Sequence, residues 1–150
     1  MSTTSKLIKT GLEEAIAGIT PTERPTRRFK VSPRDAATLS TQSVPSSAER
    51  MFEIHHGPGH LGDTHTVAQA ETVQQFLIIV CYPEEGNWDA LDDVIRSDVS
   101  DIRRALHDTG NWAEDTIHQI AGEWSAPEHD APGGRFLQGI TVIVKFLETT

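Results

Sequence analysis

The 150-residue sequence has little cysteine, few aromatic residues and no long apolar run. Its single cysteine, Cys81, cannot form a disulfide within one chain, which favours an intracellular origin. The N-terminal stretch MSTTSKLIKTGLEEAIAG lacks the apolar core of a signal peptide, and no apolar run approaches the ~20 residues that a membrane-spanning helix needs. We therefore expect one soluble domain over residues 1–150, long enough to fold without a disulfide or a metal.

Basic side chains are also scarce: 13 Lys and Arg stand against 22 Asp and Glu, which gives a net charge of −9. DNA phosphates repel such a chain, so it is a poor candidate for gripping DNA. The same charge suits a surface past which DNA slides. The basic residues concentrate early in the chain, where Arg27 and Arg28 could contact an acidic partner or could be ordinary surface charge.

Two segments have the three- and four-residue apolar spacing of amphipathic helices. The first covers residues 5–19, with Leu7 among its apolar positions, and the second carries a stripe from Trp88 to Leu106. The aspartates of the second helix, Asp98 and Asp101 among them, are expected on its solvated face. Between the helices, residues 33–49 are rich in Ser, Thr, Ala and Pro and predict a long loop.

Alternating and β-branched segments predict the strands. RRFKVS predicts a short strand, and RMFEIHH and ETVQQFLIIVCYP predict a hairpin whose projecting tip spans residues 55–72. A further strand is expected in DTIHQIAGEWS, and the last in RFLQGITVIVKFLE. The last strand is apolar on both faces, with Val142 on one and Ile143 and Leu147 on the other, which predicts a central strand of the sheet or a strand that another subunit covers.

The order of these elements predicts an α+β fold. We expect a mostly antiparallel β-sheet with an N-terminal helix and one longer amphipathic helix packed on one face. The long hairpin and the 33–49 loop are expected to project from this single domain.

Four of the seven histidines lie in FEIHHGPGHLGDTHT: His55, His56, His60 and His65. A zinc site needs three or four converging ligands, and Asp63 could add an oxygen. However, adjacent residues of a strand point to opposite faces, so His55 and His56 cannot bind one ion without a kink. The spacing matches no zinc signature. We predict a His-rich hairpin tip without a metal, and a small metal-binding module is the alternative.

Catalytic motifs are also missing from the sequence. It contains no nucleophile elbow, no Walker phosphate loop and no dinucleotide-binding glycine motif. Cys81 lies inside the apolar run FLIIVCY and is expected to be a buried structural residue. We therefore expect a structural or interaction protein, with no catalytic residues and no cofactor.

The layout resembles the tail terminator family of long-tailed bacteriophages and the related neck and tail-completion proteins. The resemblance covers most of the chain and is carried by the helix KLIKTGLEEAIAGI, the basic strand RRFKVS, the hairpin strand QQFLIIVCYP, the helix WDALDDVIRSDVSDIRRAL and the last strand GGRFLQGITVIVKFLE. The 33–49 loop and the His-rich hairpin depart from the family's pattern and look like elaborations.

The resemblance implies a structural virion protein of the tail or neck, made in the cytoplasm of the bacterial host. It implies a ring, typically a hexamer, that caps the tail tube, joins it to a head-completion or connector protein and passes double-stranded DNA without sequence-specific binding. The alternatives are another neck or head-completion protein and, more weakly, an adaptor of a toxin or secretion system. The candidate interface residues are His55, His56, His60, His65, Arg27, Arg28, Ile143 and Leu147.

Overall fold

The computed structural model describes residues 5–32, 49–65, 69–108, 116–117, 123–130 and 134–149. The helices in this part of the chain are α1 (Ser5–Ala17) and α2 (Trp88–His107), and the longer strands are β2 (Met51–His65), β3 (Gln69–Pro83) and β7 (Arg135–Thr149). The short strands are β1 (Lys30–Val31), β4 (Thr116–Ile117), β5 (Glu123–Trp124) and β6 (Glu128–Asp130). The predicted α+β fold is confirmed.

The described strands form one sheet in the order β1-β2-β3-β7-β4. The β1–β2 pair is parallel, and every other described pair is antiparallel. Strands β2, β3 and β7 have 15 residues each and form the centre of the sheet. The outer edge of β7 is paired at three successive places, by β6, β5 and β4.

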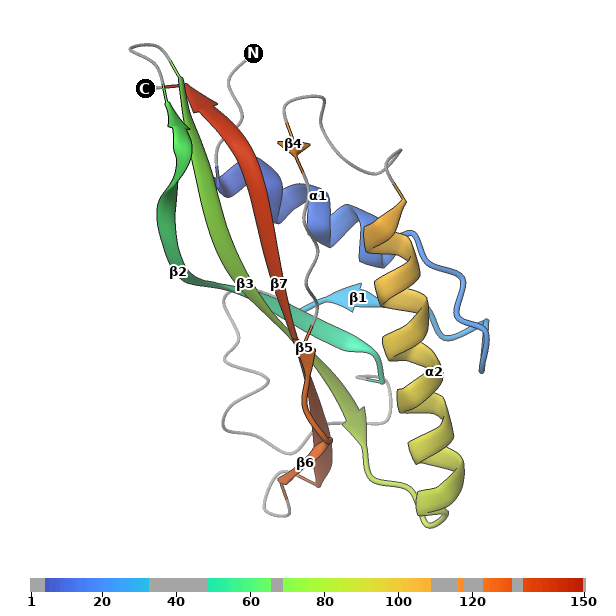
Figure 1. The fold of residues 1–150 in the computed structure, drawn as a ribbon. Helices are drawn as coiled ribbons and strands as arrows, with labels where there is room; N and C mark the ends of the chain where they lie inside the picture. Colours follow the sequence, from blue (N-terminus) through green and yellow to red (C-terminus); the bar gives the residue numbers. More distant parts are fainter. Residues whose placement is uncertain are drawn as a thin grey trace.

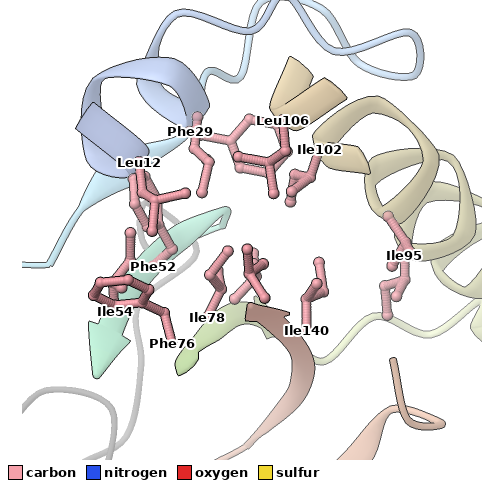
Figure 2. Close-up of a cluster of buried hydrophobic side chains, with 14 of the residues drawn as sticks. Leu12, Phe29, Phe52, Ile54, Phe76, Ile78, Ile95, Ile102, Leu106 and Ile140 are labelled. Carbon is pink, nitrogen blue, oxygen red and sulfur yellow. The ribbon is translucent and has the colours of Figure 1, made fainter. Parts of the chain in front are cut away.

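Both helices lie on the same face of the sheet, which we call the closed face (Figure 1). Alternate residues of the long strands point into this layer and meet the apolar stripes of α1 and α2 (Figure 2). The core includes Ile8, Leu12 and Ile16 from α1, Leu91, Val94, Ile95, Val99, Ile102 and Leu106 from α2, and Phe52, Ile54, Phe76, Ile78, Val80, Tyr82, Ile140, Val142, Val144 and Phe146 from the strands.

The ends of the helix stripes differ from the prediction. Asn87 caps α2 as its side chain accepts a hydrogen bond from the Ala90 backbone N–H at 3.2 Å. Trp88, at the start of the predicted stripe, is 42% exposed and packs on Phe136, with ring centroids 4.5 Å apart. Leu7 of α1 is 50% exposed. These residues lie at the margins of the stripes, where the sheet does not cover them.

The predicted hairpin is confirmed, but most of its predicted tip is strand. Strand β2 continues to His65 and β3 begins at Gln69, with shifts of register between His56 and Gly59 and between Leu61 and His65. The glycines and the proline of this region therefore lie at or beside β-bulges within a strand, rather than in a long loop.

One buried side chain accounts for the first bulge. The amide Nε2 of Gln74 donates to the carbonyl of Gly57 at 2.8 Å, a carbonyl that lies inside the register shift. A Cβ atom at Gly59 would lie 2.8 Å from Oε1 of the same Gln74 side chain, closer than the two atoms can approach. Glycine is required at this position by the close contact.

The structure describes only parts of the segment between α2 and β7 and of the predicted 33–49 loop. The DTIHQIAGEWS segment, predicted as one strand, contributes the two-residue strands β4 and β5, and β6 lies between it and the last strand. The 33–49 loop lies outside the described residues except for Glu49. Neither described helix is long and apolar enough to cross a membrane.

Candidate interaction surface

The face of the sheet that points away from the helices, which we call the open face, collects several of the predicted interface residues. Directly paired residues of antiparallel strands share a face. His55 pairs with Leu77 and His60 with Val73, while Leu147 pairs with Glu71. The side chains along the outer part of the open face are His55, His60, Glu71, Val73, Gln75, Leu77, Thr141, Ile143, Lys145 and Leu147.

The open face is mixed in polarity, and several of its aliphatic side chains are not fully covered. Leu77 is 36% exposed, and Ile143 and Leu147 are half-buried, whereas Ile78 and Val142 on the closed face are fully buried. Both described helices lie on the closed face (Figure 1). Contiguous exposed apolar side chains on a sheet are a usual mark of an interaction surface.

The end of the open face beside β6 is polar and hollowed. A cavity of about 570 Å³ is lined there by Glu53, His55, Ile79, Glu128, His129, Asp130, Arg135 and Leu137. Arg135 is buried, and its Nε donates to Asp130 at 2.9 Å. Cys81 is buried beside this cavity, and burial raises the pKa of its thiol to about 11, although the nearby Arg135 acts in the opposite direction. The thiol is therefore protonated at neutral pH, as expected for a structural cysteine.

The four candidate histidines are not brought together. His55 lies on the open face 2.9 Å from the Glu53 carboxylate, and His56 lies on the opposite face, with its ring 5.1 Å from that of Phe76. His60 is exposed on the open face, and the side chain of His65 lies outside the described part. Among the described residues, no group of three or more His, Cys, Asp or Glu side chains is placed to hold a metal ion.

The candidate arginines lie elsewhere in the molecule. Arg27 donates to Glu49 at 2.7 Å, and Arg28 donates to the carbonyl of Gly18 at 3.0 Å. The segment between α1 and β1 that carries them runs beside the helices and the start of β2, away from the far end of the β2–β3 hairpin (Figure 1). The described candidate interface residues therefore lie in three places: the open face, the opposite face at His56, and the segment before β1.

A buried ionic network ties this segment to the sheet and to α2. One edge of the Arg50 guanidinium makes a bidentate contact with the Asp98 carboxylate, through Nε at 2.7 Å and Nη2 at 2.8 Å. Tyr82 donates its hydroxyl to the same carboxylate at 2.7 Å. The remaining Arg50 protons go to backbone carbonyls of Glu23, Arg24 and Arg27, so all five donors are used.

The network has a structural role rather than a catalytic one. Arg50 and Asp98 are fully buried, and burial raises the pKa of the Asp98 carboxyl while hydrogen bonds from Arg50 and Tyr82 act against that shift. Arg50 also adopts a φ of 63°, a left-handed conformation that is rare for a side chain of this size. Its hydrogen bonds hold that conformation in place. No donor of the guanidinium remains for a ligand.

The location of Asp98 and Asp101 differs from the prediction, which placed both side chains on the solvated face of the helix. Both are buried. Asp101 accepts hydrogen bonds from the Thr22 backbone N–H at 2.8 Å and from its hydroxyl at 2.9 Å. Asp98 lies three residues after Ile95 and four before Ile102, so its spacing already placed it on the apolar stripe.

No protein-family model matches the sequence, and a search of curated proteins finds no relative.

Proposed function

We propose that the chain is a structural virion protein that assembles into a ring, and that it acts as a tail terminator. In this proposal the ring is a hexamer. It caps the tail tube, joins it to a head-completion or connector protein and passes double-stranded DNA. The α+β layout with both described helices on one face agrees with what the resemblance implies.

The observation that carries the proposal is the open face. Leu77, Ile143 and Leu147 form an aliphatic strip along β3 and β7 that keeps part of its surface exposed and that the described helices do not cover. Fully burying one such side chain contributes about 1.5–3 kcal/mol, so covering three partly exposed ones supplies roughly a few kcal/mol to an assembly. We infer that a neighbouring copy of the chain lies over this strip in the ring.

The charge of the chain supports the proposed passage of DNA through the ring. A net charge of −9 keeps a channel wall from binding DNA phosphates, so that DNA can slide through the ring. The Arg27 and Arg28 surface is separate from the open face and remains available for an acidic partner, such as the next component of the neck.

The experiment combines light scattering after size-exclusion chromatography with electron microscopy of the protein mixed with tail tubes. We expect rings in solution, or rings that form only at one end of a tube. A protein that stays monomeric and binds no tubes would contradict the proposal. Binding to the head connector but not to tubes would identify the alternative, another neck or head-completion protein.

A further inference from the structure

A groove runs between α2 and the segment 124–127, on a different side of the molecule from the open face. Its volume is about 370 Å³. Ile95 and Val99 of α2 form an apolar floor, and Trp124 and Pro127 are on the facing wall. Trp124 is 50% exposed although it is one of the largest apolar side chains of the chain.

The walls of the groove are held in place from both sides. Strand β5 pairs with the centre of β7, where Trp124 lies opposite Ile140. The amide Nε2 of Gln138 donates to the carbonyl of Ser125 at 2.7 Å. The groove is therefore part of the folded scaffold and does not need to form when a ligand arrives.

The rim of the groove carries positive charge in an acidic protein. Arg103 stacks on Trp124, with its guanidinium carbon 4.3 Å from the ring centroid. Such stacking orients the guanidinium and leaves its edge free to donate two parallel hydrogen bonds to a carboxylate. Arg96 lies two turns earlier on α2 and donates to Asp92 at 3.0 Å, which leaves the rim with one more cation than anions.

We propose that this groove binds an acidic segment of a partner protein, in which an aliphatic side chain stands next to a carboxylate. The aliphatic side chain lies on Ile95 and Val99 against the indole of Trp124, and the carboxylate accepts from Arg103. Charge complementarity favours this partner. Although the whole chain is acidic, the rim of this groove is basic and surrounds an apolar floor, so it should attract a carboxylate that stands next to an aliphatic side chain. The proposal does not depend on the ring or on the tail.

The test uses two capped peptides, Gly-Leu-Asp-Leu-Gly and its neutral counterpart Gly-Leu-Asn-Leu-Gly, titrated into the ¹⁵N-labelled full chain. We expect the acidic peptide to shift the Trp124 indole N–H signal saturably and the neutral peptide to bind at least fivefold more weakly. Arg103→Gln should reduce binding of the acidic peptide to the level of the neutral one. The matched control is Arg104→Gln, because Arg104 contacts Asp101 on the other flank of α2 at 3.4 Å.

Each remaining outcome counts against the proposal. Equal binding of the two peptides would show an apolar cleft without charge selection. Unchanged binding by an Arg103→Gln variant with the wild-type melting temperature would remove the role of the guanidinium. The absence of a saturable shift at millimolar peptide would overturn the site itself.

Discussion

On the closed face of the sheet, Ile78 and Val142 are fully buried under the helices, whereas on the open face their sequence neighbours Leu77 and Ile143 keep part of their surface in solvent. The two sets of side chains are similar in size and hydrophobicity and lie on the same strands. The difference is what covers them: α1 and α2 lie on one face only (Figure 1). Alternate residues of one strand can therefore differ in role, and our proposal assigns one set to the fold and the other to assembly.

The largest effect should come from a charge on the closed face. Val142→Asp places a carboxylate among fully buried aliphatic side chains, with no cation beside it in the described core. Such burial costs several kcal/mol, a large part of the roughly 5–15 kcal/mol that keeps a domain folded. We expect the variant to be unfolded or molten at 25 °C by circular dichroism. A cooperative melt near the wild-type temperature would contradict the assignment of this face as the core.

The next effect tests the buried network, which joins the closed face to the 21–28 segment. Asp98→Ala leaves the Arg50 guanidinium buried without its carboxylate, and breaking a buried pair in this way costs about 3–5 kcal/mol. Urea unfolding followed by fluorescence measures the loss. The control is Asp92→Ala, which breaks an exposed pair with Arg96 on the same helix and should cost at most about 0.5 kcal/mol. Equal losses for the two variants would mean that the network does not stabilise the fold.

A smaller effect concerns the surface pair between Arg24 and Glu85. Hydrogen bonds from Arg24 lower the pKa of the Glu85 carboxyl below its usual 4.5. Because the folded-state pKa is the lower one, the pair stabilises the fold above the unfolded-state pKa, and this contribution is lost as pH falls through the folded-state value. Glu85→Gln should therefore cost about 0.5–1 kcal/mol at neutral pH and almost nothing at a pH well below the lowered folded-state pKa. Urea unfolding of both proteins at the two pH values checks this, and a loss that does not depend on pH would count against the ion pair.

Much of the fold could be predicted because it depends on local periodicity. The spacing of apolar residues located α1 and α2, and the strand patterns located β3, β7 and the start of β2 to within a few residues. The two faces of the last strand were also predicted, since the side chains of a strand alternate whatever it packs against. The hairpin tip was misjudged, because the Gly57 to Gly62 region looks like a turn until Gln74 is known to fill the bulge.

The contacts that hold the molecule together could not be predicted in the same way. Asp98 finds its partners 48 residues away at Arg50 and 16 residues away at Tyr82, and no local pattern joins them. The only signal was the position of an aspartate on an apolar stripe. Of the candidate interface residues, His55, His60, Ile143 and Leu147 share the open face, while His56, Arg27 and Arg28 do not.

The smallest effect on the fold of one chain, and the most direct test of the account, comes from Ile143→Asp. The substitution changes a half-buried residue on the open face, one position along the strand from Val142. The measurement is the oligomer mass by light scattering together with the melting temperature, for wild type, Ile143→Asp and Val142→Asp in parallel. We predict that Ile143→Asp keeps a cooperative melt within a few degrees of the dissociated wild-type chain but no longer assembles. If it melts as badly as Val142→Asp, or assembles as the wild type does, the open face is not the surface between subunits.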